Sequence, residues 1–285
     1  MGKIAVLTDS CSSLPADYVA QHNIHIIPLY LLVDGKTLRD GLDITSEEFY
    51  ELLPKAKPLP TTSQPSVGDF VEAYGALVAA GATDIVSVHI TSGISGTVNS
   101  AQLAAKEING ARIEIIDTQC VEAAEVAITE AAVAAVERGA SMDEVIAAAR
   151  RVVEQQRTVF TVDTLEYLYK GGRIGGGTAL VGSLLQFKPL LHFVDGKITA
   201  LERQRTTARA MRRLVELQCE WVGKTEPQRA VIMQAACPER AEELSALITQ
   251  EMNIADVLIV PLSPVIGTHT GNGTLGLMCC PMSAM

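Results

Sequence analysis

The sequence lacks the long apolar run that a membrane-spanning helix needs. No stretch reaches the roughly 18 apolar residues of such a helix, and residues 1–7 resemble a strand, not a secretion signal. An excess of positive charge is also missing, since 23 Lys and Arg stand against 33 Asp and Glu. Because a nucleic acid needs a basic protein surface, this balance argues against a nucleic-acid partner. We expect a cytoplasmic protein without an integral membrane segment.

The six cysteines lack the spacing of a metal site or of a disulfide framework. None forms C-x-x-C, and the only close pair consists of the neighbours Cys279 and Cys280. The histidines form no H-E-x-x-H motif, and no glycine run ends in the G-K-[ST] of a phosphate-binding loop. We therefore expect reduced thiols, no metal and no cofactor.

The secondary-structure pattern of the sequence changes after the middle of the chain. In the first half, short β-rich runs alternate with helical patterns, which is typical of a parallel sheet with crossover helices. After residue 157, hairpin signals mix with helices, which favours antiparallel pairing. We predict an α/β protein of two domains. Residues 1–157 form an N-terminal parallel-sheet, Rossmann-like domain, and residues 158–285 form a C-terminal α+β domain with antiparallel hairpins.

Asp-Gly pairs mark two of these hairpins. One pair, Asp34-Gly35, lies between the predicted strands 25–33 and 36–38, and the other, Asp195-Gly196, separates two apolar runs of the second half. Both central positions of a type I′ turn need a positive φ, which Asp and Gly tolerate. Tight two-residue turns are therefore expected at both places.

A loop rich in glycine and hydroxyl side chains, residues 91–97, links a predicted strand to a predicted helix. In an open α/β sheet, ligands bind beyond the carboxyl ends of the strands, where such a loop lies. The helix start offers free N–H groups, Gly96 allows close backbone approach, and Ser95 adds a hydroxyl donor. These features predict a site for a small anion; a capped helix after a tight turn is the alternative.

Two further segments carry donors for the same anion. Thr62 lies in the hydroxyl-rich loop 61–66, ahead of the serines that fit an N-cap of the next helix. In the predicted loop 264–273, three glycines surround His269 and Thr270. A histidine donates to a carboxylate whether it is neutral or charged. We predict Thr62, His269 and Thr270 as ligand-binding residues, with a simple helix cap and a structural histidine as the alternatives.

Ser95 and His269 also allow a second hypothesis, a serine hydrolase that acts on acyl esters. The nucleophile motif G-x-S-x-G is not matched, because Gly96 follows Ser95 directly. The sequence marks out no acidic residue that would orient His269. Binding without catalysis is therefore the favoured interpretation, and the hydrolase stays as its alternative.

Two basic segments remain. Residues 171–177 hold five glycines around Arg173, but they match neither a dinucleotide-binding nor a phosphate-binding loop. This segment fits a loop that presents Arg173 to a partner or a phosphate, or a plain loop. Arg205 belongs to the one concentrated basic segment, which also contains Arg203, Arg209, Arg212 and Arg213. Such a segment is either a solvated helix face or a surface that attracts an acidic partner.

The chain resembles the DegV family, which includes the fatty-acid-binding subunits of bacterial fatty-acid kinases. The resemblance covers essentially the whole chain and rests on several motifs in the family's order. These are Thr8-Asp9-Ser10, Thr62-Ser63-Gln64-Pro65-Ser66, Ser92-Gly93-Ile94-Ser95-Gly96-Thr97, Leu165-Glu166-Tyr167-Leu168, Lys170-Gly171-Gly172-Arg173-Ile174-Gly175, Lys188-Pro189 and Gly267-Thr268-His269-Thr270-Gly271.

The resemblance implies two α/β domains that bury a long acyl chain between or within them. The family residues that hold the carboxylate match Thr62, Ser95 and His269. Family arginines that serve the kinase partner and the acyl-phosphate match Arg173 and Arg205. The implied protein is not an enzyme by itself: it binds a long-chain fatty acid and presents it to a separate fatty-acid kinase catalytic subunit.

The sequence departs from the family pattern at two places near these motifs. Asn272 stands where proline commonly follows His-Thr-Gly, and Met233-Gln234 replaces a histidine and a small residue at a strand end. Neither departure removes a carboxylate donor. They bear on chain-length preference and kinase compatibility.

Overall fold

A parallel sheet organises the first half of the chain. The computed structural model describes residues 2–174 and 187–285. Its four-stranded sheet has the order β2-β1-β6-β7, and all neighbours are parallel. The strands are β1 (Ile4–Asp9), β2 (His25–Ile27), β6 (Asp84–His89) and β7 (Arg112–Asp117). The predicted parallel sheet is confirmed.

A larger, mostly antiparallel sheet organises the second half. Its six strands have the order β10-β9-β8-β13-β11-β12, and only the β11–β12 pair is parallel. They are β8 (Arg157–Thr161), β9 (Lys188–Val194), β10 (Lys197–Gln204), β11 (Gln228–Gln234), β12 (Ile254–Pro261) and β13 (Leu275–Pro281). The α/β architecture predicted from the sequence is confirmed, whereas the domain boundary at residue 157 stays a prediction.

A third, three-stranded sheet comes from the first half of the chain. It has the order β4-β3-β5 and consists of β3 (Tyr30–Val33), β4 (Lys36–Arg39) and β5 (Thr61–Ser63). The single strand predicted over residues 25–33 is wrong, because β2 and β3 belong to different sheets and Pro28 stands between them. Proline has no N–H to continue a ladder. The turn at Asp34-Gly35 has the positive φ values expected of both residues.

Helices cover the sheets. They are α1 (Ala16–Gln21), α2 (Ser46–Leu52), α3 (Val67–Ala79), α4 (Thr97–Ala105), α5 (Ala123–Glu137), α6 (Met142–Gln155), α7 (Glu166–Lys170), α9 (Thr207–Val222), α10 (Pro238–Glu251) and α11 (Pro264–Thr270), with short 3₁₀ turns at Ser10–Ser12, Leu53–Lys55 and Met282–Ala284. Capping boxes at Thr45, Ser66 and Ser141 fix three helix starts. No helix within 2–174 and 187–285 is long and apolar enough to cross a membrane.

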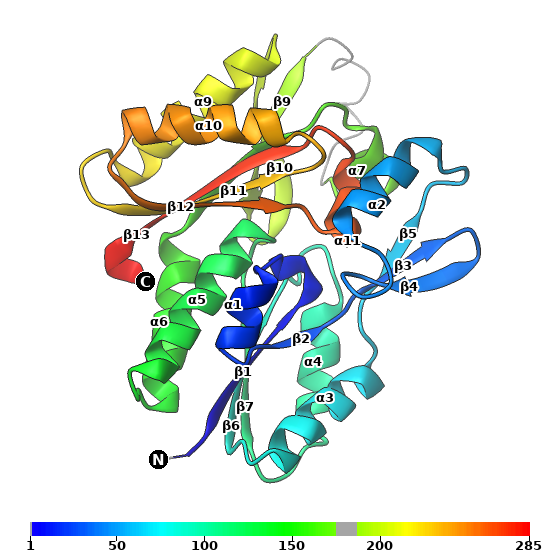
Figure 1. The fold of residues 1–285 in the computed structure, drawn as a ribbon, viewed down its shortest axis with the longest axis vertical. Helices are drawn as coiled ribbons and strands as arrows, with labels where there is room; N and C mark the ends of the chain where they lie inside the picture. Colours follow the sequence, from blue (N-terminus) through cyan, green and yellow to red (C-terminus); the bar gives the residue numbers. More distant parts are fainter. Residues whose placement is uncertain (1, 175–186) are drawn as a thin grey trace.

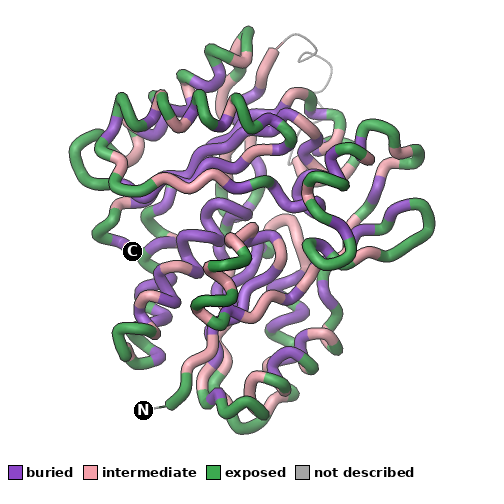
Figure 2. Tube along the Cα trace, in the orientation of Figure 1, coloured by how far each residue is buried: buried purple, intermediate pink, exposed green. Residues whose placement is uncertain are grey.

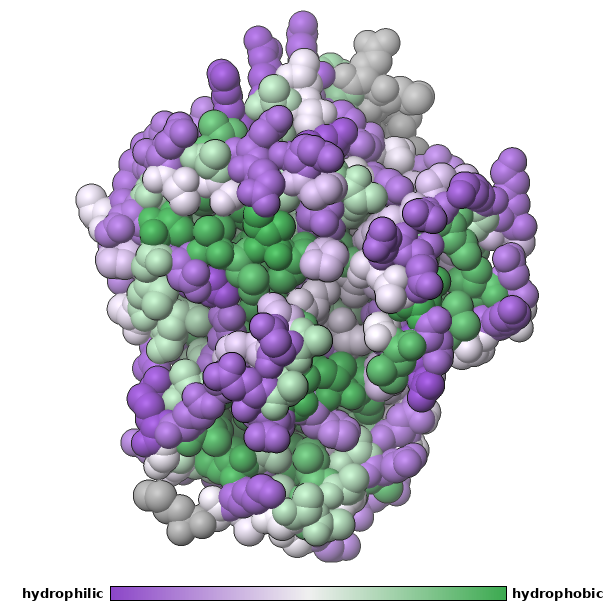
Figure 3. Space-filling model, in the orientation of Figure 1, coloured by the Kyte–Doolittle hydropathy of each residue, from purple (hydrophilic) through white to green (hydrophobic). Residues whose placement is uncertain are grey.

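The main hydrophobic core joins the two larger sheets. α9 and α10 cover one face of the six-stranded sheet, and its other face lies toward α5 and the parallel sheet (Figure 1). The inner strands β1, β6, β8, β11 and β13 are buried along most of their length, whereas many helix turns on the outside are exposed (Figure 2). Figure 3 shows hydrophobic residues gathered over the edge strand β12 and hydrophilic ones over the surrounding helices. The two larger sheets therefore face each other across a shared apolar core.

Candidate functional site

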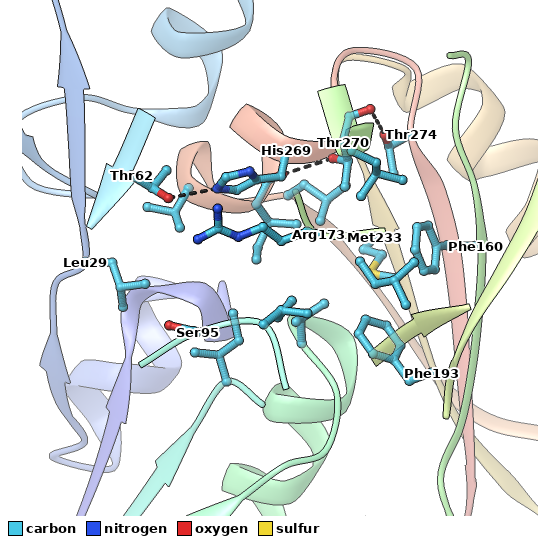
Figure 4. A pocket seen from close by; sticks show the side chains of 18 of the residues that line it. Leu29, Thr62, Ser95, Phe160, Arg173, Phe193, Met233, His269, Thr270 and Thr274 are labelled. Carbon is cyan, nitrogen blue, oxygen red and sulfur yellow. Dashed lines mark hydrogen bonds between the residues drawn. The ribbon is translucent and has the colours of Figure 1, made fainter. Parts of the chain in front are cut away.

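A mainly apolar cavity lies between the two sheets and next to α11. Its volume is about 50 Å³. Hydrophobic side chains from both halves of the chain form most of its wall: Leu29, Ile90, Ile94, Val121, Phe160, Leu168, Phe193, Ile198, Met233, Leu262, Val265 and Ile266. Polar side chains gather toward one end, where Thr62, Ser95, Arg173 and His269 lie (Figure 4). The cavity thus has an apolar wall and a polar end, which together suit an amphipathic ligand.

Thr62 and His269 meet at the polar end. A hydrogen bond of 2.8 Å joins Thr62 Oγ1 and His269 Nε2, across 207 positions of the chain (Figure 4). Thr62 lies on strand β5, which pairs with β3, and His269 lies in the last turn of α11. The predicted loops at both residues are therefore wrong. Regular backbone pairing fixes Thr62 and His269 more firmly than loops would.

The loop predicted around His269 is a helix because of tertiary packing. Glycine disfavours a helix interior, so the glycines around His269 predicted a loop. In the structure, Gly267 packs against the Tyr50 ring, where a β-carbon would overlap the hydroxyl group. Ser263 caps the helix, accepting a hydrogen bond from the Ile266 N–H, and Pro264 occupies its first turn. Packing against α2 therefore outweighs the low helix propensity of Gly267.

His269 is neutral at pH 7 and has one nitrogen free. Burial, together with the positive charge of Arg173, lowers the pKa of His269 to about 4. Its Nδ1 is buried and has no hydrogen-bond partner among the described residues. This nitrogen faces Gly171, where any side chain would overlap the ring. A neutral imidazole carries a single ring N–H, so Thr62 Oγ1 accepts from Nε2 in one tautomer and donates to it in the other.

Ser95 and Gly96 lie across the cavity from Thr62. They belong to the turn before α4, and Gly96 is its N-cap residue. The Ser95 hydroxyl lies 2.8 Å from Thr97 Oγ1 and accepts a 3.3 Å hydrogen bond from the Thr97 N–H. A β-carbon on Gly96 would lie 2.6 Å from the Gln64 amide nitrogen, so glycine leaves room for that side chain. The structure thus brings Thr62, Ser95 and His269 to one end of the cavity, and Gly96 follows Ser95 in the same turn.

The remaining predicted residues divide into three cases. Thr270 lines the cavity, but its hydroxyl donates to the Ile266 carbonyl oxygen at 3.1 Å. Arg173 also lines it, and its Nη1 donates to the Gly171 carbonyl oxygen at 2.6 Å. Arg205 is exposed after β10 and is not among the described residues that line the cavity. Residues 175–177 of the glycine run lie outside the described residues.

The polar end also reaches a recess on the surface. This recess has a volume of about 340 Å³, and three residues, Thr62, Arg173 and His269, line both spaces. Lys170 and Tyr167 complete one side of the recess. Asn272 holds the neighbouring helix end, since its amide donates to the Tyr50 carbonyl oxygen at 3.1 Å. Thr62, Arg173 and His269 therefore lie between the apolar cavity and the surface recess.

The contacts of Ser95 do not form a catalytic triad. Among the hydrogen bonds of the described residues, none joins Ser95 to His269. A triad-like arrangement exists elsewhere, with 2.6 Å from Ser87 Oγ to His89 Nε2 and 3.0 Å from His89 Nδ1 to Asp9 Oδ2. All three of its residues are fully buried, so a substrate cannot reach that serine.

The apolar wall was missed by sequence reasoning. Phe160 and Phe193 lie 5.8 Å apart between ring centroids at the end opposite to Thr62, with Met233 beside them (Figure 4). They come from the strands β8, β9 and β11, whose residues alternate between the two faces of the sheet. The sequence shows this alternation but not which face meets the cavity. Met233 was noted only as a departure from a family pattern.

The whole chain matches known proteins. Residues 3–282 match the family model described as "Uncharacterised protein, DegV family". A DegV domain-containing protein of Listeria innocua is 34% identical over 96% of this chain and 97% of its own. A solved structure described as fatty acid binding of a DegV family protein from Thermus thermophilus has 33% identity and a TM-score of 0.92, covering 98% of this chain and 100% of the other. DegV of Bacillus subtilis, described as a fatty acid binding protein, has 33% identity and a TM-score of 0.90, covering 99% and 100%.

Proposed function

This chain belongs to the DegV family, and on that premise we propose that it is a lipid-binding protein that holds a long-chain fatty acid. The carboxylate lies at Thr62, Ser95 and His269, with Gly96 and Thr270 beside it, and the acyl chain extends toward Phe160, Phe193 and Met233. The proposal rests chiefly on the division of one cavity into a polar end and an apolar wall. Relatives described as fatty acid binding proteins support it.

The energetics of such a complex are favourable at both ends. A buried carboxylate must be hydrogen-bonded, and hydrogen bonds to a charged group contribute roughly 1.5–3 kcal/mol each. Burial of the chain adds about 0.8 kcal/mol for each methylene. The cavity of about 50 Å³ is small for a long chain, so we expect the apolar side chains to move apart when it enters. Met233 suits this adjustment because its thioether side chain is flexible.

The proposed role includes presentation of the head group to a separate kinase subunit. Support comes from the surface recess that shares Thr62, Arg173 and His269 with the cavity. Through it, the catalytic subunit of a fatty-acid kinase reaches the carboxylate and forms the acyl-phosphate. Arg173 and Lys170 line the recess and offset the negative charge of the phosphate. Arg205, exposed on the same half of the chain, contacts the partner.

Binding of a length series tests the first part. Fatty acids of about 14 to 18 carbons should bind with increasing affinity until the cavity ends. The alcohol of equal length should bind more weakly, because it lacks the carboxylate. Equal affinities for acid and alcohol would contradict a carboxylate site. Ester turnover that disappears in Ser95→Ala would support the hydrolase instead.

A reconstituted reaction tests the second part. The palmitate-loaded protein is mixed with ATP and the catalytic subunit of a bacterial fatty-acid kinase, and acyl-phosphate is trapped with hydroxylamine. We expect product that depends on this protein and falls in Arg173→Ala, while palmitate stays bound. No product with a loaded protein would contradict the kinase role and leave fatty-acid binding standing.

A further inference from the structure

A buried glutamate outside the cavity holds the helix that carries His269. Glu122 precedes α5 and is fully buried. Its Oε1 accepts a 2.8 Å hydrogen bond from the backbone N–H of Ser263, which is 141 positions away in the chain and is the N-cap residue of α11. The contact therefore links the start of α5 directly to the start of the helix on which His269 lies.

The same contact adjoins the acyl cavity on both sides. Val121, next to Glu122, lines the cavity, and so does Leu262, next to Ser263. Glu122 has a φ of 46°, which a residue with a β-carbon rarely adopts. Such strain persists only where surrounding contacts maintain it, and it often marks a functional position. The Glu122–Ser263 contact thus connects the cavity wall with the helix that bears the carboxylate donor.

The environment of Glu122 favours its neutral form. Burial raises the pKa of Glu122 to about 8, although hydrogen bonds from Ser263 and Ser13 oppose the shift, and the nearby Asp40 raises it further. Its second oxygen, Oε2, is buried without a hydrogen-bond partner among the described residues. A neutral carboxyl group resembles the amide of glutamine in size and in its carbonyl acceptor. Glutamine should therefore replace Glu122, whereas alanine should not.

We infer that Glu122 is a positioning residue for fatty-acid binding: through the Ser263 N–H it sets the place of α11, and thereby of His269, relative to the acyl cavity. This inference rests on the proposed function, and it adds a residue that does not touch the ligand. It predicts that the loss of Glu122 weakens recognition of the carboxylate and spares burial of the acyl chain.

The test compares palmitate with hexadecanol on the full-length protein. In Glu122→Ala the dissociation constant for palmitate should rise about tenfold, as expected for one lost hydrogen bond, and that for hexadecanol should stay nearly unchanged. Glu122→Gln should restore palmitate binding. Glu125→Gln is the control: Glu125, in the first turn of α5, is equally buried, but it accepts from Thr8 of β1, and no hydrogen bond among the described residues joins it to α11.

A second pair of variants changes Ser263, the hydrogen-bond partner of Glu122. They provide the test if Glu122→Ala does not fold. Ser263→Pro removes the N–H that Glu122 accepts, at a φ of −59° that already suits proline. Ser263→Ala removes only the side chain. Palmitate affinity should fall more in Ser263→Pro than in Ser263→Ala, and Glu122→Ala should cause no further loss in the Ser263→Pro protein.

Equal losses for palmitate and hexadecanol, or unchanged palmitate binding in both Glu122→Ala and Ser263→Pro, would overturn the inference. A palmitate loss in Glu125→Gln as large as that in Glu122→Ala would overturn it as well, because it would indicate a general loss of structure. A wild-type protein that binds neither ligand would instead contradict the proposed function itself. The two failures are thus distinguishable.

Discussion

Two histidines of this chain have opposite surroundings. His89, at the end of β6, is fully buried, and both of its ring nitrogens have partners, Ser87 and Asp9. His269 lies beside a cavity, and its one hydrogen bond among the described residues goes to Thr62, so Nδ1 remains without a partner. The glycines around His269 predicted a binding role for it, and the structure shows how its contacts differ from those of His89.

The difference indicates how a structural histidine is told from a binding one. The partners of His89 saturate it, and its chain of contacts continues through Ser87 to Tyr74, which is also buried. Such a network stabilises the fold when every member is satisfied. His269 lies at the polar end of an apolar space, where Thr62 is its one hydrogen-bond partner among the described residues. An incomplete network beside a cavity is where a ligand group completes the hydrogen bonding.

The largest effect should follow removal of the structural histidine. In His89→Ala the buried carboxylate of Asp9 loses a partner, which should lower the free energy of unfolding by about 3–5 kcal/mol. Urea unfolding measures this. In His269→Ala the same quantity should change by only about 1 kcal/mol. Equal losses of stability in the two variants would contradict the distinction between a structural and a binding histidine.

Removal of the binding histidine should act on affinity instead. His269→Ala should weaken palmitate binding by roughly 10- to 100-fold, because a hydrogen bond to a charged group contributes about 1.5–3 kcal/mol. Calorimetric titration of the folded variant measures the dissociation constant. Thr62→Val, which deletes the hydroxyl that contacts the His269 ring, should weaken binding in the same direction. Full palmitate affinity in both variants would contradict the assignment of the polar end.

Two buried carboxyl groups, Asp40 and Glu122, extend the comparison to the pH dependence of stability. Burial raises the pKa of Asp40 to about 7 and that of Glu122 to about 8. Since the folded state holds these protons more tightly, their stabilising effect is complete below about pH 4 and is lost as pH rises toward 8. Each group should lower the free energy of unfolding by up to about 1.4 kcal/mol per pH unit within that range.

Unfolding between pH 5 and 8 checks this sign. The slope should flatten in Glu122→Gln, which cannot ionise. It should be unaffected by Glu243→Gln, which alters an exposed carboxylate of α10. Histidines with a lowered pKa, such as His269, contribute a slope of the opposite sign, so the difference between the wild type and Glu122→Gln isolates Glu122. An unchanged slope in Glu122→Gln would contradict the raised pKa of Glu122.

The smallest effect concerns the charge of His269 itself. In the ligand-free protein its pKa is lowered to about 4. A carboxylate beside the ring favours the charged imidazolium, so palmitate should raise this pKa by about one unit, equivalent to about 1.4 kcal/mol. NMR of the histidine rings measures it. Hexadecanol should leave the His269 titration unchanged, and neither ligand should alter the His89 signals.

Local signals predicted the fold well where they determine the backbone directly. Asp34-Gly35 and Asp195-Gly196 form the expected turns with positive φ. Capping boxes at Thr45, Ser66 and Ser141 are local signals of the same kind, and each starts a helix. Prediction failed where distant contacts decide. Residues 264–270 are helical because α11 packs on Tyr50, a contact that no local pattern reveals.

The candidate site likewise contains residues that the sequence predicted and residues that it did not. Thr62, Ser95 and His269 were predicted from hydroxyl-rich and glycine-rich segments together with a family resemblance, and the structure places them around one cavity end. The apolar wall depends on which face of each strand meets the other sheet. Glu122 was not predicted at all, because its role arises from one hydrogen bond across 141 residues.

Native mass spectrometry of the purified protein, followed by extraction of bound lipid, shows directly whether the protein binds a fatty acid. We expect close to one fatty acid per chain, with clearly lower occupancy in Thr62→Ala, Ser95→Ala and His269→Ala. Glu125→Gln, which alters a buried carboxyl group away from the cavity, should retain its fatty acid. A wild-type protein that is empty, and stays empty after incubation with acids of about 14 to 18 carbons, would contradict the account.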